Sequence, residues 1–267
     1  GNSHASEDFA FLIIDSGQGD QMEANADTYG QCSGGSLCNA ANGCSSCDHS
    51  TGFDWLDVAF SSVSQNPVVI SQIQSHTGGD WVKTRQRSIT SNGFQVKQEE
   101  DGLDIGHNTE VYGWIAMSVG TGDKAGVQFE AIKTPDAVTH EPYTVSFATT
   151  WSSPPAIFSA MQTFDGGDPS HMRMTSAATT TEVDLFVEEE TCSDEELRHT
   201  TETVGVVAMK TNWVPPAPPP IVPVSGTYAN LLEVGEVTNV ALSNVVITYT
   251  GAFTDPVIIG GTPSHNG

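Results

Sequence analysis

The chain has 267 residues, with 33 acidic against nine basic side chains and a net charge of −24. A field of that sign repels nucleic acid and anionic lipid, and no apolar run reaches the roughly 18 residues of a membrane span, so we expect neither a nucleic-acid partner nor membrane insertion. Hydrophobic residues make up 37% of the chain, and Thr, Ser, Val and Gly are abundant, which predicts thin all-β domains.

Residues 1–17 have the pattern of a strand that closes a repeat unit. A short His-x-Ser/Thr-Glu segment precedes an apolar run here, and the same pattern recurs twice further along the chain. Its copies are residues 4–7, 107–110 and 199–202. One pattern at a fixed place before a strand predicts a repeat architecture. Four acidic residues near this tail lie among glycines and are candidates for calcium binding through oxygen ligands: Asp15, Asp20, Glu23 and Asp27.

Residues 21–120 are predicted to form the first complete unit. Period-two alternation and short apolar runs bounded by turn residues are typical of strands. The expected strands are residues 55–60, 68–73, 81–87, 93–98 and 111–117. A Cys-rich insertion, residues 31–50, interrupts this unit.

Four of the five cysteines lie in that insertion: Cys32, Cys38, Cys44 and Cys47. A loop with so little apolar surface cannot order itself by burial, so we expect two disulfides and an oxidising compartment. A zinc site or free thiols are the alternatives, although only Cys44 and Cys47 have a CxxC spacing. Cys192 would then be a spare thiol or an intermolecular link.

Residues 127–212 are predicted to be a second complete unit. Its expected strands are residues 143–149, 156–161, 171–175, 181–188 and 204–209, of which the last is apolar on both faces and should be central. Residues 213–226 form a Pro-rich linker, which favours a semi-rigid polyproline II spacer. Residues 227–267 match the front half of a further unit. The fold class is therefore all-β, with tandem antiparallel sandwiches of about six strands each.

The chain thus begins and ends inside a unit. One interpretation is that it is a window of a longer array. The other is that the front half-unit of one copy is completed by the tail of the next, in a head-to-tail assembly.

The second unit resembles the H-type lectin domain of snail agglutinins. The resemblance rests on residues 145–158 and on the closing strand 204–209, which residues 112–117 match in the first unit. It implies a six-stranded antiparallel sandwich, assembly as trimers or hexamers, and binding of galactose or N-acetylgalactosamine. No residue-by-residue counterpart of a sugar site is assigned. The units also resemble bacterial-type extracellular repeats with an Asn-Gly-Gly-Asp-Pro turn, partly preserved at residues 166–169.

Several polar residues are ligand candidates. His107 with Glu110, and His199 with Glu202, could be metal ligands, a hydrogen-bonded pair or part of a turn held by His and Ser/Thr hydrogen bonds. Asp80 and Asp168 each follow two glycines, which predicts turns with positive φ and leaves a ligand role open. The acidic runs 99–101 and 188–190 are interpreted as solvated faces.

No hydrolase, phosphate-loop or metalloprotease motif occurs in the sequence, so we expect no enzyme and assign no cofactor, with calcium as the one candidate. The leading hypothesis is a structural subunit of an extracellular or cell-surface filament, surface layer or adhesive array that associates with itself. The alternative is a carbohydrate-binding lectin module of a secreted protein.

Overall fold

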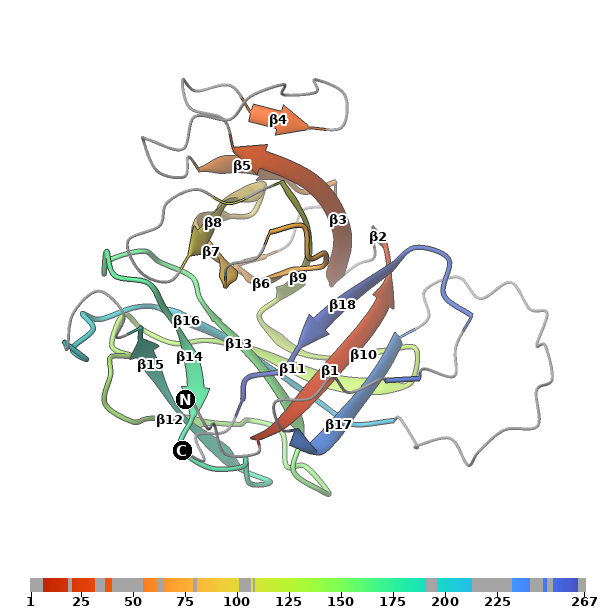
Figure 1. Ribbon diagram of the computed structural model, residues 1–267. Helices are drawn as coiled ribbons and strands as arrows, with labels where there is room; N and C mark the ends of the chain where they lie inside the picture. The colour runs from red at the N-terminus through yellow and green to blue at the C-terminus, as the bar shows by residue number, and fades with distance from the viewer. Residues whose placement is uncertain are drawn as a thin grey trace.

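The computed structural model describes residues 7–18, 21–31, 37–39, 55–61, 65–78, 81–100, 107, 109–190, 196–212, 232–240, 247–248 and 252–263. These residues form five small antiparallel sheets and contain no α-helix, which confirms the all-β class (Figure 1). Within the same residues there is no helix long and apolar enough to cross a membrane.

Unit 1, residues 21–120, is a sandwich of two sheets. Its inner sheet has the order β2-β3-β9-β6, with β4 beside β3. The strands of this sheet are β2 (Gly17–Gln18), β3 (Met22–Gln31), β4 (Leu37–Asn39), β6 (Pro67–Ile73) and β9 (Glu110–Ser118). The outer sheet has the order β5-β8-β7, with strands β5 (Leu56–Ala59), β7 (Val82–Thr90) and β8 (Gly93–Glu100). Every strand expected in this unit is present.

Unit 2, residues 127–212, repeats the arrangement. Its inner sheet has the order β10-β11-β16-β13. The strands are β10 (Gly120–Lys124), β11 (Val127–Lys133), β13 (Ala156–Met161) and β16 (Val204–Met209). The outer sheet, β12-β15-β14, consists of β12 (Tyr143–Ser146), β14 (Ser170–Met174) and β15 (Glu182–Glu189). β15 alternates buried and more exposed residues, and β16 is buried at every position, as its two apolar faces predict.

Unit 3 joins the two ends of the chain in one sheet. β1 (Glu7–Asp15) pairs with both β17 (Leu232–Val240) and β18 (Pro256–Gly260), and Figure 1 shows it lying between them. The order β17-β1-β18 matches β3-β9-β6 and β11-β16-β13. β1, from the tail, therefore completes the sheet of β17 and β18 within the same chain. In the part of unit 3 that is described, no second sheet covers this one.

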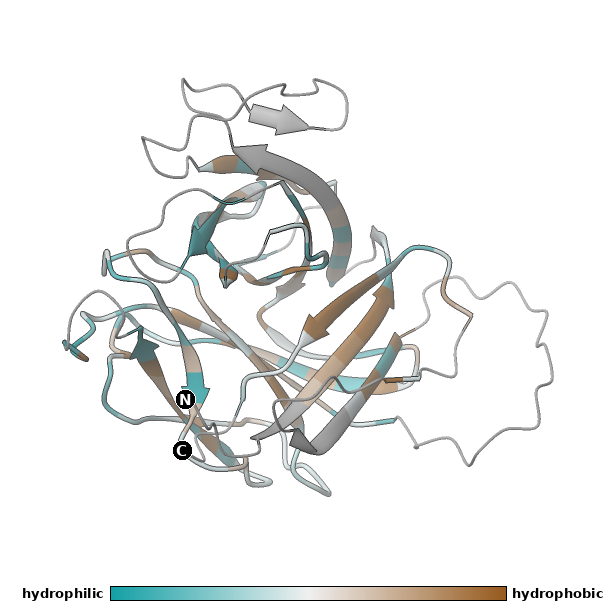
Figure 2. Cartoon of the chain, in the orientation of Figure 1, coloured by the Kyte–Doolittle hydropathy of each residue, from teal (hydrophilic) through white to brown (hydrophobic). Residues whose placement is uncertain are grey.

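The three inner sheets share one hydrophobic core. Each contributes alternate residues of its three matching strands, such as Leu12 and Ile259 from unit 3, Ile115 from unit 1 and Phe158 from unit 2. Figure 2 shows these strands as the most hydrophobic part of the fold. Separate cores lie between the two sheets of unit 1 and between those of unit 2. A lone three-stranded sheet is barely stable in water, so packing against the other two inner sheets stabilises unit 3.

Hydrogen bonds between neighbouring units run in a ring. Gln162 of unit 2 accepts from Val69 N (2.9 Å) and donates to Val69 O (2.8 Å) of unit 1. Gln74 of unit 1 makes the same pair of bonds with the backbone of Ile258 in unit 3, at 2.9 and 2.6 Å. Thr262 N of unit 3 closes the ring by donating to Ile157 O of unit 2 at 2.9 Å. One residue on each inner edge strand thus has backbone polar groups bonded across the boundary.

Candidate functional site

Units 1 and 2 each contain a buried histidine held between two glutamates. In unit 1, His107 Nδ1 lies 2.7 Å from Glu100 Oε1, and Nε2 lies 3.0 Å from Glu110 Oε1. In unit 2, His199 Nδ1 lies 2.6 Å from Glu189 Oε1, and its Nε2 lies 3.2 Å from Glu202 Oε1. We call these the Glu–His–Glu clusters. Each forms because an outer strand ends beside the loop that enters the central strand of the inner sheet.

The second glutamate of each cluster also holds a turn. Glu110 accepts hydrogen bonds from the Ser75 hydroxyl, from Thr77 N at 2.7 Å and from Gly78 N at 3.1 Å. Ser75 Oγ in turn accepts from Val111 N at 2.7 Å. The turn after β6 is therefore tied to the start of β9 through a single carboxylate.

Unit 2 repeats these bonds with different side chains. Glu202 accepts from the Thr163 hydroxyl, from Asp165 N at 2.9 Å and from Gly166 N at 3.2 Å. Of the interpretations left open from the sequence, the structure shows the hydrogen-bonded pair and the held turn. His and Glu meet although they are three residues apart, because residues 107 and 199 precede the strands.

The Gly-Gly-Asp segments have a different physical basis from the one expected. Gly78, Gly166 and Gly167 do not have positive φ. A Cβ on Gly78 would lie 2.4 Å from His107 Cε1, and one on Gly166 would lie 2.3 Å from His199 Cε1. Only glycine lets the turn backbone pass this close to the imidazole, so the expectation of positive φ was wrong for these three glycines, and Gly79 lies outside the described residues.

Hydrogen bonding sets the charge state of these clusters. Burial alone would raise the pKa of Glu110, but the bonds from Ser75, Thr77, His107 and Gly78 lower it from 4.5 to about 2. Burial likewise opposes the ionised form of Glu202, and its hydrogen bonds lower its pKa. Burial would lower the pKa of His199, but the bonds and charges of Glu202 and Glu189 raise it. Both its ring nitrogens face carboxylates, which accept but do not donate, so the imidazolium suits this position.

The acidic runs are not the solvated faces that were expected. Glu99, Glu100 and Glu189 are only 4–5% exposed. Glu100 and Glu189 belong to the clusters. Glu99 forms ion pairs with Arg85 (3.1 Å), Lys83 (3.9 Å) and Lys97 (3.5 Å). Buried carboxylates need such partners, because desolvation of a lone charge is costly.

Arg85 of unit 1 reaches the cluster of unit 2 across the boundary between the two units. Its Nη1 donates to Ser170 Oγ at 3.0 Å, and its Nη2 lies 3.5 Å from Glu202 Oε1. Its guanidinium also lies 4.6 Å from the ring centroid of Phe164, which is packed edge-on against Trp55. The sequence patterns did not point to these residues. The signal that could have found them is the recurrence of the acidic run beside each His-x-x-Glu segment.

The remaining sequence candidates do not converge on one place. Asp168 is exposed, and Asp80 lies outside the described residues. Asp15 Oδ1 accepts from Thr254 N and Asp255 N at 2.8 and 3.1 Å, whereas buried Glu23 accepts from Ser61 N at 3.0 Å.

The calcium site and the two disulfides therefore stay predictions. Asp20 and the side chain of Asp27 lie outside the described part, as do Cys32, Cys44, Cys47, Cys192 and the side chain of Cys38. No group of three or more metal-binding side chains that could hold a metal ion occurs among the residues the structure describes.

The chain is similar to halomucin. The similarity is to halomucin of Haloquadratum walsbyi (strain DSM 16790 / HBSQ001), at 30% identity over 187 residues, 66% of this chain. The chain spans about 2% of the length of halomucin, which is therefore a far longer protein. No family model and no solved structure matches the chain, so the resemblance to H-type lectins stays a prediction.

Proposed function

We propose that this chain is a structural module of a large extracellular repeat protein, of the kind that builds a filament, surface layer or adhesive array. The observation that carries this proposal is the closure of unit 3 by β1, which makes a ring of three inner sheets around one core. The similarity to a small part of halomucin supports the assignment to a very long repeat protein.

A non-catalytic role fits the buried clusters. His107, Glu110, His199 and Glu202 are at most 4% exposed. A general acid or base must come within hydrogen-bond reach of a substrate, and these groups are instead bonded to one another and to turn amides. Their arrangement holds each sandwich closed, which is a structural task.

Exchange of β1 offers a route to self-association. β1 is joined to β2 of unit 1 by the short connection at Ser16, and it pairs on both edges with strands more than 200 positions away in sequence. The same pairing between two copies would give the open head-to-tail assembly considered from the sequence. The charge of −24 opposes contact between copies, and salt screens that repulsion.

Sedimentation and negative-stain imaging test the proposal. We expect the purified chain to form oligomers or fibres that grow with protein concentration and with salt between 0.1 and 1 M, a range over which the Debye length falls from about 10 to about 3 Å. Strictly monomeric particles at every concentration and salt level would count against the array. A glycan array separates the lectin alternative, because saturable binding of galactose or N-acetylgalactosamine favours it.

A further inference from the structure

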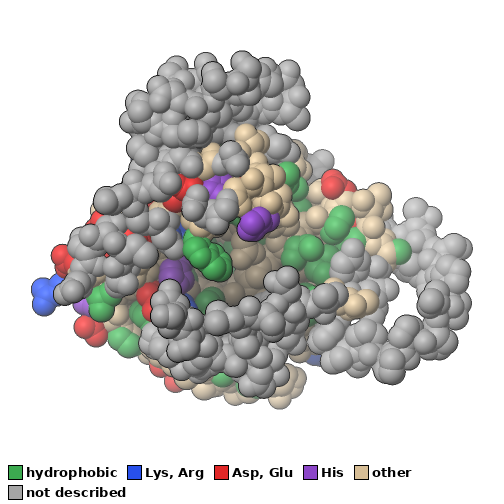
Figure 3. Space-filling model, in the orientation of Figure 1, with side chains coloured by type: hydrophobic (Ala, Val, Ile, Leu, Met, Phe, Trp, Pro, Cys, Tyr) green, Lys and Arg blue, Asp and Glu red, His purple; other side chains and the backbone are tan. Residues whose placement is uncertain are grey.

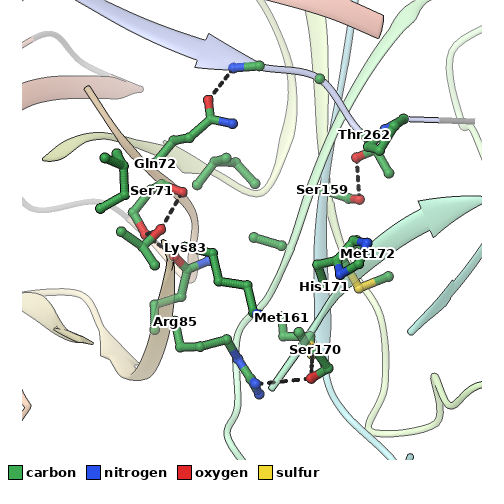
Figure 4. Close-up of a pocket in the computed structure, with 18 of the residues that line it drawn as sticks. Ser71, Gln72, Lys83, Arg85, Ser159, Met161, Ser170, His171, Met172 and Thr262 are labelled. Atoms are coloured by element: carbon green, nitrogen blue, oxygen red, sulfur yellow. Dashed lines mark hydrogen bonds between the residues drawn. The ribbon is translucent and has the colours of Figure 1, made fainter. Parts of the chain in front are cut away.

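A pocket of 370 Å³ opens where the three units meet. Its walls are the ends of the inner strands β6, β13 and β18 and the outer strands β7 and β14 (Figure 4). β7 and β14 hold matching places in units 1 and 2, and the described part of unit 3 has no strand in the third such place. The pocket therefore opens beside β18, where the described residues include no outer strand, and Figure 3 shows the surface hollowed near the middle of this face.

The chemistry of the pocket differs from that of the rest of the molecule. Among the described residues that line it there is no Asp or Glu, although the chain has 33 of them. It is lined instead by Lys83, Arg85 and His171, in a chain with nine Lys and Arg in total. An acidic protein has thus placed cations, and no carboxylate, on the walls of this cavity.

Two of these cations occupy equivalent positions. Lys83 stands opposite Glu99 across the β7–β8 pair, and His171 stands opposite Glu188 across the β14–β15 pair. Their side chains are 21% and 43% exposed. The neighbouring glutamates hold the cations in place, at 3.9 Å for Lys83 and 3.0 Å for His171. Two units therefore direct a basic side chain to the same cavity, from matching positions on β7 and β14.

Hydroxyl and amide groups complete the polar wall. Ser159 and Thr262 are hydrogen-bonded to each other at 2.5 Å across the boundary of units 2 and 3, and Gln72 accepts from Gly260 N across the boundary of units 1 and 3 (Figure 4). Ser71 Oγ donates to Gln86 Oε1 at 2.6 Å, and Thr84 Oγ1, which donates to Ser71 O at 2.7 Å, lies 2.9 Å from the same hydroxyl. These bonds fix the groups before any ligand arrives, which reduces the entropic cost of binding.

The size of the pocket decides what it can hold. Its volume equals that of about a dozen water molecules in liquid water, and it lies near the lower end of the 300–1,000 Å³ typical of small-molecule sites. A pair of strands such as β7 and β8, which have 9 and 8 residues, is too large to enter it. A small ligand fits the space better than a segment of another copy.

We propose that this pocket binds a hydroxylated organic carboxylate about as large as one sugar residue. The carboxylate would lie between Lys83 and His171, and the hydroxyl groups would face Ser159, Thr262 and Gln72. This inference does not depend on the structural role proposed above, because a chain that stays monomeric would keep the same pocket.

Methionine methyl NMR on the full chain tests the proposal at this site. Of the six methionines, Met161 and Met172 line the pocket, whereas Met22 and Met209 lie in the central core and report on the fold. Titration with glucuronate should shift the Met161 and Met172 signals saturably and leave the other two unchanged. Glucose lacks the carboxylate and acetate lacks the hydroxyls, so the affinity for each should be lower than that for glucuronate by about tenfold or more.

Two variants and a control complete the test. Lys83→Gln should weaken glucuronate binding about tenfold, since it removes one charged hydrogen-bond donor, and Lys124→Gln on β10 should leave it unchanged. Ala160→Leu should fill the pocket and abolish the glucuronate-induced shifts of Met161 and Met172. The signals of Met22 and Met209 should keep their wild-type positions, which shows that the variant is folded. Equal binding of glucose or acetate, or no shift of Met161 and Met172 at millimolar glucuronate, would overturn the proposal. So would unchanged affinity in folded Lys83→Gln.

Discussion

Replacement of Glu110 by glutamine tests the physical role of the Glu–His–Glu cluster most directly. The substitution keeps the size of the side chain and removes its charge. A pKa lowered from 4.5 to about 2 corresponds to about 3 kcal/mol of stabilisation by the ionised carboxylate. Glu110 is 1% exposed, so solvent screening does not reduce this figure much. We therefore expect Glu110→Gln to lower the free energy of unfolding by about 3 kcal/mol at pH 7.

The pH dependence of that loss of stability shows whether the missing carboxylate charge or altered packing causes it. Because the folded-state pKa of Glu110 lies below its unfolded value, its contribution is complete above pH 4.5 and disappears as the pH falls toward 2. About half of it should be gone near pH 3. The difference between wild type and Glu110→Gln should shrink in the same way, since the other acidic groups titrate alike in both proteins.

Guanidinium unfolding followed by tryptophan fluorescence at pH 7, 5 and 3 measures this difference. Glu141→Gln is the matched control, because the Glu141 side chain is 77% exposed, and its effect should stay within about 0.5 kcal/mol at each pH. A deficit for Glu110→Gln that is equally large at pH 7 and pH 3 would refute the electrostatic explanation and leave only altered packing.

Further predictions concern the turn, the ring and the second cluster. Gly166→Ala should cost about 1–3 kcal/mol, because its Cβ would lie 2.3 Å from the imidazole of His199, whereas Gly167→Ala, which meets nothing within 4 Å, should change thermal stability by about 1 kcal/mol at most. Gln162→Ala should destabilise more than Gln74→Ala in chemical unfolding, by about 1–3 kcal/mol, because Gln162 is buried and water can replace the more exposed amide of Gln74. His199 has a raised pKa, so its contribution to the free energy of unfolding is complete below pH 6.5 and is lost as the pH rises through the folded-state pKa. His199→Gln should therefore remove part of the decline of the melting temperature at alkaline pH. An unchanged decline in the variant would contradict this.

The strands of units 1 and 2 could be predicted because local pattern decides them. β13 and β16 begin and end at the expected residues, since Pro154 and Pro155 stop one segment and apolar residues on both faces define the other. The ends of β7 and β8 run two to three residues beyond the prediction, where polar residues continue the ladder. Backbone pairing depends little on side-chain polarity, so the pattern could not mark these ends.

The clusters were only half predictable. The His-x-x-Glu segment repeats in the sequence, and it led to His107, Glu110, His199 and Glu202. The first glutamate of each cluster and Arg85 come from other strands, and their burial follows from the partners that the fold brings to them. An isolated acidic run is normally solvated, so composition alone points in the wrong direction here.

The closure of unit 3 lies beyond local pattern for a related reason. The sequence showed a tail and a front half-unit that fit each other, but it could not say whether they belong to one copy or two. β1 and β18 are separated by most of the chain, and only the shared core of the three inner sheets brings them together. Loop-closure cost grows slowly with length, so this separation is no obstacle once the core forms.

Unit 3 departs from the pattern of units 1 and 2 at the place where the pocket lies. Units 1 and 2 use Gln74 and Gln162 to bond a neighbouring strand, and unit 3 has Pro263 at the matching position. Proline has no amide side chain, and instead Pro263 O accepts from Met174 N at 2.9 Å while Thr262 N donates to unit 2. Backbone groups just after β18 therefore make the hydrogen bonds to unit 2, whereas a glutamine side chain makes the corresponding bonds in units 1 and 2. Among the described residues no outer strand lies beside β18, and Lys83 of β7 and His171 of β14 line the pocket next to it.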